Sequence, residues 1–214
     1  MRPWPRFPVT TIGSWPRPNW LLDAVKRKRE NLAELQDQAT LLAIKLQEDA
    51  GADIITDGEQ RRDNFFSYVA DRLEGVRLMS MAELLDFVDD KAAFEAMLGA
   101  LDVPAYAIKN PVVAEKIRVR KPLAMDDFRF LREHTHKPVK VTLPGPYLLA
   151  RSCYVSALTS AAYPSREAMA DDFVAILRAV LQALAAAGCE VVQFDEPVLT
   201  EIVFAGKSNT HTFM

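Results

Sequence analysis

The chain has 214 residues, of which 50% are hydrophobic and 26% charged, and its formal net charge is -3. This composition is typical of a globular protein with one sizeable core, and such mild acidity gives no reason to expect nucleic acid or membrane as a partner. Cys153 and Cys189 lack CxxC spacing, and no run of eighteen apolar residues occurs. The sequence therefore favours buried, reduced thiols in the cytoplasm and predicts no transmembrane helix.

Predicted strands and helices alternate along the chain. The predicted strands are short apolar or β-rich stretches: FPVTTIGSW (7–15), DIIT (53–56), KPVKVTL (137–143) and VVQF (191–194). The predicted helices show helical spacing or capping signals: 32–52, stopped by Gly51; 78–100, with Ser80 as cap; 124–135; and 165–188, with Ser165 as cap and Gly188 after its end. Residues 103–117 read as a hairpin that turns around Lys109-Asn110-Pro111.

The alternation of strands and helices predicts an α/β protein with a parallel sheet. In such sheets the carboxyl ends of the strands carry the chemistry. Turn residues or carboxylates follow each predicted strand: Gly13-Ser14, Asp57-Gly58-Glu59, Pro144-Gly145-Pro146 and Asp195-Glu196-Pro197. We expect these four groups to line one rim around a shared pocket.

Four stretches resemble, in order, the catalytic C-terminal barrel of the cobalamin-independent methionine synthase family: TTIGSWPRP, TDGEQRRDNFF, KPVKVTLPGPYLL and VVQFDEPVLTE. The resemblance runs from about Val9 to Glu201 and is weak in 78–102. It implies a (β/α)8 TIM barrel that transfers a methyl group to the thiol of homocysteine or a similar thiol. A full barrel takes about 250 residues, so residues 1–214 are expected to form its N-terminal half, with an α/hairpin insert at about 78–120.

The resemblance also implies roles for individual residues. Ile12, Gly13 and Ser14 match the motif that holds the carboxylate of the amino acid through backbone and hydroxyl groups. Glu59 and Asp195 match the carboxylates that hold its ammonium group. An ammonium group needs acceptors in a partly dry pocket, where charge-assisted hydrogen bonds are strong.

The methyl donor is less well defined by the resemblance. Glu201 matches an acid near the pterin of methyl-folate, but the family's other folate contacts, an Arg-Cys pair and a Trp, correspond to Tyr106-Ala107 and about Ser152. The basic residue and the stacking aromatic are not evident. Folate and another carrier, such as a corrinoid protein, both stay open as the donor.

The resemblance implies zinc as the cofactor, because a free thiol with a pKa of about 8.5 is mostly protonated at pH 7. The family's His-x-Cys ligand pair does not occur in this sequence, and His134 and His136 precede a strand, opposite the expected rim. We expect no metal site within this chain and zinc ligands beyond Met214. The expected partners are a thiol substrate, a methyl donor, and an oligomer or complementary barrel half.

Simpler interpretations remain for most of these residues. Asp195-Glu196 would cap the next element, the loop from Glu59 to Asp63 would be solvated, and Ser14 would be a turn hydroxyl. Gly145 is expected to shape the rim, and Lys26-Arg27-Lys28-Arg29 is expected to be a solvated face. At the level of function, the alternative is an inactive fragment that only binds amino acids.

Overall fold

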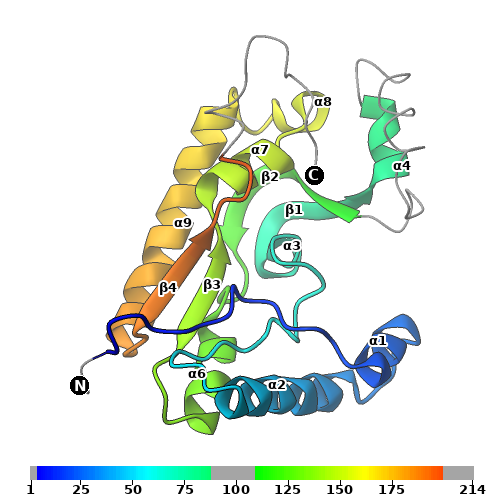
Figure 1. Cartoon of the computed structure of the whole chain (residues 1–214). Helices are drawn as coiled ribbons and strands as arrows, with labels where there is room; N and C mark the ends of the chain where they lie inside the picture. Colours follow the sequence, from blue (N-terminus) through cyan, green and yellow to red (C-terminus); the bar gives the residue numbers. More distant parts are fainter. Residues whose placement is uncertain (1–3, 88–108, 200–214) are drawn as a thin grey trace. The chain divides into compact units, whose positions relative to one another are not determined.

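The computed structural model describes residues 4–87 and 109–199 (Figure 1). These residues fall into two compact units. Unit 1 consists of residues 4–65, 122–143 and 179–194, and unit 2 consists of residues 66–87, 109–121, 144–178 and 195–199. Within these described ranges, no helix combines the length and the apolar character that crossing a membrane would require.

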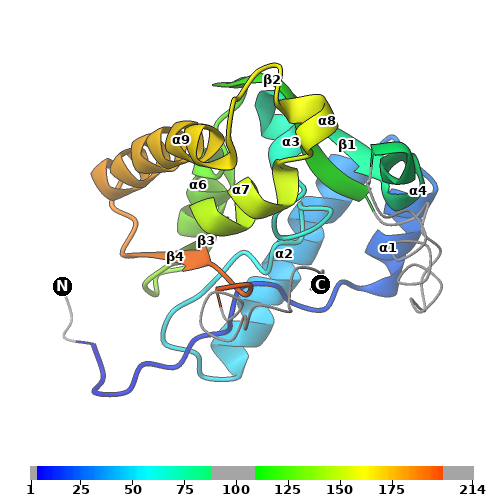
Figure 2. The ribbon, with the colours of Figure 1, turned by 90° about the horizontal axis from the view of Figure 1, so that it is seen from above.

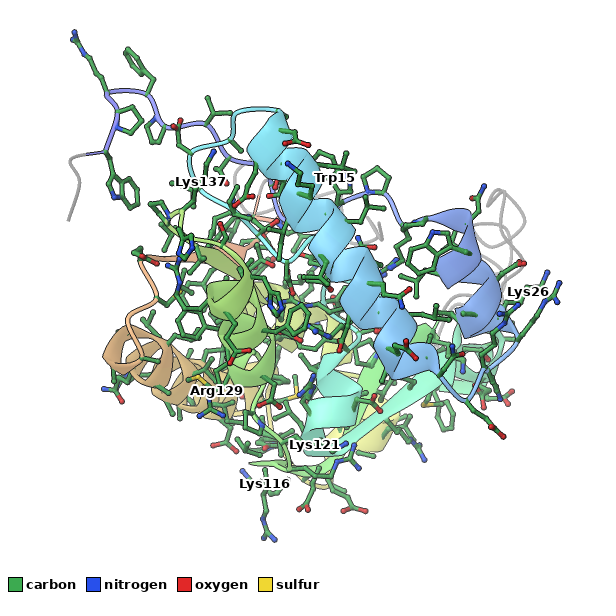
Figure 3. The ribbon with its side chains drawn as sticks, turned by 90° about the horizontal axis from the view of Figure 1, so that it is seen from below. Trp15, Lys26, Lys116, Lys121, Arg129 and Lys137 are labelled. Carbon is green, nitrogen blue, oxygen red and sulfur yellow. The ribbon has the colours of Figure 1, made fainter. Side chains whose placement is uncertain are left out.

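Helices α1 (Asn19–Lys26) and α2 (Leu32–Asp49) of unit 1 contact each other, with Lys26 at the end of α1 (Figure 3). The predicted helix 32–52 is confirmed by α2, which ends at Asp49, two residues before Gly51 with its φ of +83°. Helix α1 was not predicted from the sequence. Lys26 at the end of α1 and residues 27–29 after it are all exposed, as expected of a solvated face.

The first two predicted strands of unit 1 are reduced to short parallel bridges. Thr10 bridges Ile54, and Ile55 bridges Val139. Ile54 and Ile55 are buried, whereas Thr10 is exposed. The chain segments around residues 10, 54–55 and 139 therefore lie side by side in chain order and run parallel.

The other two predicted strands are confirmed as β3 (Lys140–Pro144) and β4 (Val191–Asp195), which pair with each other. Both arrows point the same way in Figure 1, and the strands also lie side by side in Figure 2. Every residue of β3 is buried, which is typical of a parallel strand covered on both faces. The α/β class predicted from the sequence is therefore confirmed.

Two further predicted helices are present. Helix α6 (Met125–His134) contacts α2 in unit 1. Helix α9 (Arg166–Ala186) begins after Ser165, whose hydroxyl oxygen accepts a hydrogen bond from the N–H of Ala168 at 3.2 Å. Gly188 follows its end with a φ of +87°. The capping signals read from the sequence therefore mark the ends of α9 correctly.

Unit 2 is built around an antiparallel pair of strands, with short helices before and after it. Its elements are α3 (Val69–Arg72), β1 (Leu73–Ser80), α4 (Met81–Leu84), the 3-10 helix η1 (Leu85–Phe87), β2 (Lys109–Val119), α7 (Pro146–Cys153) and α8 (Ser156–Thr159). β1 pairs with β2 from Leu73 opposite Val119 to Ser80 opposite Lys109, with a register shift between Glu74 and Val76. Both α7 and α8 contact β2.

The predicted hairpin turn at Lys109-Asn110-Pro111 is wrong. These three residues lie inside β2, where Pro111 pairs with Leu78 of β1. Pro111 begins a buried apolar run that continues through Val113, and burying that run in the packed strand prevails over the local preference of Asn-Pro for a turn. The rest of the predicted hairpin before residue 109 lies outside the described residues.

The predicted helix 78–100 is correct only in part. Residues 78–80 belong to β1, and the helix starts at Met81. Ser80 is its cap, as predicted: the Ser80 hydroxyl accepts the N–H of Glu83 at 3.2 Å, and the Glu83 carboxylate accepts the N–H of Ser80 at 2.6 Å. Residues 88–100 lie outside the described residues.

The Tyr163 hydroxyl links β2 to the first part of α9 by hydrogen bonds within unit 2. Its buried hydroxyl accepts the N–H of Ile117 at 2.9 Å and donates to Asp172 Oδ2 at 2.7 Å. The ammonium group of Lys116, which Figure 3 labels, lies 3.9 Å from the centre of the Tyr163 ring. Burial, followed by the bond to Asp172, raises the pKa of Tyr163 to about 12.

Candidate functional site

The loop after Ile55 is buried from Thr56 to Gln60, so the solvated interpretation of Glu59 is wrong. Asp57 Oδ1 accepts the N–H of Glu59 at 3.0 Å, which closes a tight local turn. Gly58 and Glu59 both have positive φ angles, +65° and +55°. Glycine adopts this conformation readily, but in other residues it stores about 1–3 kcal/mol and persists only where the surroundings enforce it.

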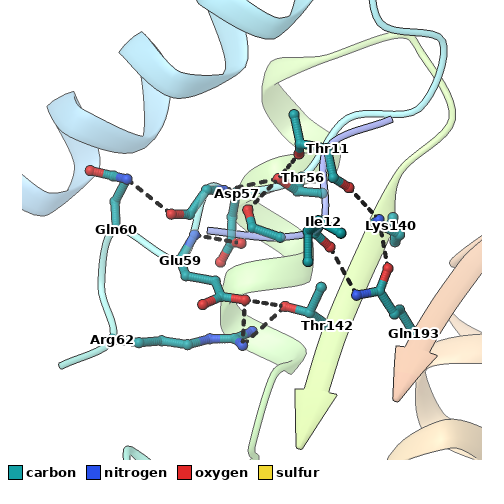
Figure 4. A network of polar contacts seen from close by, with 12 residues as sticks. Thr11, Ile12, Thr56, Asp57, Glu59, Gln60, Arg62, Lys140, Thr142 and Gln193 are labelled. Carbon is teal, nitrogen blue, oxygen red and sulfur yellow. Dashed lines mark hydrogen bonds and ion pairs between the residues drawn. The ribbon is translucent and has the colours of Figure 1, made fainter. Parts of the chain in front are cut away.

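The carboxylate of Glu59 is held by two buried side chains (Figure 4). The Thr142 hydroxyl donates to Glu59 Oε1 at 2.8 Å, and Arg62 Nη1 lies 3.7 Å from the same oxygen. Arg62 Nη1 also donates to Thr142 Oγ1 at 3.1 Å. Glu59 is 4% exposed and Arg62 is 5% exposed, so the guanidinium balances a carboxylate that water hardly reaches.

Gly13 makes room for this carboxylate. A Cβ atom on Gly13 would lie 2.7 Å from Glu59 Oε1 and 2.8 Å from Thr142 Cγ2, both closer than real Cβ contacts. The φ angle of Gly13 is not in the left-handed region, so space is what requires a glycine. Two of the predicted site residues, Gly13 and Glu59, are therefore brought into direct contact.

The loop that contains Gly13 is held by hydrogen bonds from three side chains to three successive backbone carbonyls. The buried ammonium group of Lys140 donates to Thr11 O at 2.5 Å and to Gln193 Oε1 at 2.7 Å. Gln193 Nε2 in turn donates to Ile12 O at 2.9 Å, and the Thr56 hydroxyl donates to Gly13 O at 2.9 Å (Figure 4). The Ile12 side chain is 80% exposed, so only its backbone takes part in these contacts.

Backbone contacts tie the next part of this loop to the Glu59 turn. The N–H of Trp15 donates to Gly58 O at 3.0 Å. Gln60 Nε2 donates to Trp15 O at 2.8 Å and to Gly58 O at 2.9 Å. Ser14 lies between these anchored residues and is exposed. The predicted residues Ile12, Gly13, Ser14 and Glu59 therefore lie in one hydrogen-bonded part of unit 1.

Asp195, the remaining predicted ammonium ligand, belongs to unit 2. It is the last residue of β4, and its carbonyl accepts the N–H of Gly145 at 2.8 Å. Glu201 lies outside the described residues, as does Tyr106-Ala107. Ser152 lies in α7, and its carbonyl accepts Nδ2 of Asn110 at 2.7 Å.

The described residues do not fit a zinc ion. Among them, no three His, Cys, Asp or Glu side chains gather as metal ligands would. Burial raises the pKa of the Cys153 thiol far above its usual value and, as the largest of several causes, raises that of Cys189 as well. Both thiols are thus protonated at neutral pH, and thiolate is the form that binds zinc. His134 Nδ1 lies 2.7 Å from the carbonyl of Phe130.

Sequence reasoning missed four residues that position this site: Arg62, Lys140, Thr142 and Gln193. The strand KVTL offered a signal, because polar Lys140 and Thr142 alternate with apolar residues and must share one face of β3. Arg62 is three residues after Glu59, and in a tight turn this spacing brings the Arg62 side chain back to the Glu59 carboxylate. The alternation in β3 and the spacing from Glu59 to Arg62 point to this site only once a buried carboxylate is known to lie nearby.

The sequence of this chain is similar to those of known proteins. A family model described as "Cobalamin-independent synthase, Catalytic domain" matches residues 7–214. Methionine synthase from Sulfurisphaera tokodaii is 30% identical over 202 residues, which make up 91% of this chain and 53% of that protein. Methionine synthase from Saccharolobus solfataricus is 28% identical over 202 residues, with 91% and 54% covered.

A solved structure is similar as well. The B12-independent methionine synthase from Shewanella sp. W3-18-1, in complex with selenomethionine, superimposes with a TM-score of 0.68 at 30% identity, covering 92% of this chain and 54% of that one. The chain therefore spans about half the length of the relatives it matches. Because the family model matches nearly all of its residues, the chain belongs to the cobalamin-independent methionine synthase family.

Proposed function

We propose that this chain provides the amino-acid-binding part of a methyltransferase that transfers a methyl group to the thiol of homocysteine or a similar thiol. The relatives named above are methionine synthases, and the Shewanella enzyme was solved with selenomethionine. Glu59 carries the proposal. It is a buried carboxylate in a strained backbone conformation, with a glycine opposite that leaves it room.

In this proposal Glu59 and Asp195 accept hydrogen bonds from the substrate's ammonium group. A carboxylate in a mostly dry site forms stronger bonds to a cation than it would in water. A carboxylate can accept several donors at once, so the contacts with Thr142 and Arg62 orient Glu59 without removing its capacity to bind. Arg62 Nη1, 3.7 Å from Glu59 Oε1, places a positive charge beside this carboxylate and orients it.

Ile12, Gly13 and Ser14 hold the substrate's carboxylate in this proposal. The carbonyl groups of Ile12 and Gly13 are already bonded to protein side chains. This anchoring fixes the loop before a ligand arrives, so less conformational entropy is lost on binding. The exposed hydroxyl of Ser14 can donate to a carboxylate oxygen.

We further propose that the four parallel segments are the first four strands of a (β/α)8 barrel. Their pairing in chain order, from residue 10 to β4, supports this topology. Zinc and a methyl donor remain part of the proposal, as does a complementary barrel half or another copy of the chain. The described residues offer no donor set for zinc, so no step of this chain's chemistry is assigned to it.

Calorimetric titration with L-homocysteine tests the proposal. 4-Mercaptobutanoate, which lacks the amino group, serves as the comparison ligand. Glu59→Gln should weaken homocysteine binding by about 10- to 150-fold, because it removes one charged hydrogen bond worth about 1.5–3 kcal/mol. It should leave binding of the amine-free ligand almost unchanged, and exposed Glu133→Gln serves as the matched control. Equal affinity of the wild-type chain for both ligands would overturn the proposal.

A further inference from the structure

The carboxylate of Glu196 caps helix α7 within unit 2. The N–H of Tyr147 donates to Glu196 Oε1 at 2.7 Å, and the N–H of Leu148 donates to Oε2 at 2.8 Å. These amides belong to the first turn of α7, where no carbonyl of the helix itself can accept them. Pro146, the first helical residue, has no N–H. Both oxygens of Glu196 are therefore bonded to the helix end, where the helix dipole also favours a negative charge.

Gly145 leaves the space that the Glu196 carboxylate occupies. A Cβ on Gly145 would lie 2.1 Å from Glu196 Oε1 and 2.2 Å from its Cδ. The φ of Gly145 is -76°, which any residue adopts, so the missing side chain is what matters. Ser, Thr, Asp and Asn are the usual caps at such a position. In unit 2 a glutamate from a distant part of the chain takes the place of a local cap.

We propose that Glu196 is a positioning residue that fixes Asp195 for its contact with the substrate's ammonium group. Three hydrogen bonds join the turn after β4 to the start of α7: the two to Glu196 and the one from Gly145 N–H to Asp195 O. They hold the backbone carbonyl of Asp195 and the side chain of the residue that follows it. This inference rests on the proposed function, which gives Asp195 its role.

The adjacent acids of this motif thus have different roles. Asp195 and Glu196 would repel each other if both faced one pocket, and the charge of Asp195 is one cause that raises the pKa of Glu196, after burial. The two amide groups of α7 act against this rise. Because α7 takes up the charge of Glu196, in this proposal the cationic ligand is assigned to Asp195 alone of the two acids.

The test compares Glu196→Ala with Glu196→Ala/Gly145→Ser in the full chain. The removed glutamate side chain supplies all three nearest contacts of the Gly145 Cβ, so the serine side chain of the double variant has space to cap α7 by itself. Amide hydrogen exchange at Tyr147 and Leu148 reports the cap, and the NMR signal of the Asp195 carboxyl carbon reports its position without any ligand. Titration with L-homocysteine and 4-mercaptobutanoate reports amine recognition.

Glu196→Ala should speed exchange at both amides about tenfold or more, as loss of charge-assisted bonds predicts. It should also shift the Asp195 signal and weaken only homocysteine binding. Adding Gly145→Ser should restore slow exchange but neither the Asp195 signal nor the affinity. If the double variant restores all three, Glu196 is only a cap and the inference is wrong. Exposed Glu115→Gln is the control and should change none of them.

The ligand-free signals separate the two proposals. If the wild-type chain binds homocysteine no better than 4-mercaptobutanoate, the proposed function fails, yet the Asp195 signal still decides whether Glu196 positions its neighbour. An Asp195 signal that Glu196→Ala leaves unchanged would overturn the inference, whatever the titrations show.

Discussion

Replacing Gly13 by alanine should destabilise the chain by about 2–3 kcal/mol. The new Cβ would lie 2.7 Å from Glu59 Oε1 and 2.8 Å from Thr142 Cγ2, and both side chains are buried, so neither can move into solvent. Overpacking of this kind costs about 1–3 kcal/mol. The same oxygen accepts the Thr142 hydroxyl at 2.8 Å, and weakening that charged bond costs part of a further 1.5–3 kcal/mol or so. Alanine also makes the unfolded chain less flexible than glycine does, which offsets about 0.4–1 kcal/mol of this loss of stability.

Urea unfolding of wild type and Gly13→Ala measures this difference in the free energy of unfolding. Gly188→Ala is the matched control, because Gly188 has a φ of +87° and nothing lies within 4 Å of its Cβ position. That variant carries only a backbone penalty of about 1–2 kcal/mol. The double variant Gly13→Ala/Thr142→Ser removes the clashing methyl group and keeps the hydroxyl, so it should recover part of the loss. Gly13→Ala unfolding at the same urea concentration as wild type would refute the close-contact argument.

Three further outcomes are expected. Tyr163→Phe should lower the free energy of unfolding by about 1–3 kcal/mol in urea melts, because the N–H of Ile117 and the carboxylate of Asp172 lose their buried partner; an unchanged midpoint would count against this contact. Asp195→Asn should weaken homocysteine binding by about 1.5–3 kcal/mol in calorimetry, and unchanged affinity would reduce Asp195 to a turn residue. Burial raises the pKa of Glu196 above its usual 4.5, so the folded chain holds this proton more tightly than the unfolded chain does. This contribution to the free energy of unfolding is complete below pH 4.5 and is lost as the pH rises through the raised pKa of Glu196. The stability of wild type relative to Glu196→Gln should therefore fall as the pH rises. A stability difference that increases with pH would contradict the assignment.

Local sequence patterns predicted the long helices well, because spacing and caps are local. Helices α2 and α9 combine helical spacing with a clear end signal, Gly51 or Ser165, and α6 was predicted without one. The hairpin around Pro111 was misjudged because its turn preference is local whereas the pairing of β2 with β1 is not. The first strands reduce to bridges at Thr10 and Ile54, which no single-segment pattern distinguishes from a longer ladder.

The candidate site was predictable only where a motif carries it. The strand-end pattern placed Gly13 and Glu59 at the expected rim and the family resemblance gave them roles, but the sequence alone does not tell whether a glycine is needed for its φ angle or for space. Lys140 and Gln193 act on the Ile12 loop from strands far along the chain. Such polar groups in apolar strands become interpretable only once their partners are known.

A selenium anomalous map tests the central claim most directly. Crystals of the chain, grown with ordinary methionine and soaked with L-selenomethionine, contain selenium only in the ligand. The account predicts a selenium peak beside the Gly13–Glu59 loop, with the ligand's ammonium nitrogen within about 3 Å of a Glu59 carboxylate oxygen and no ordered ligand in Glu59→Gln crystals soaked in the same way. A selenium peak elsewhere, or a ligand whose ammonium group faces away from Glu59, would contradict it.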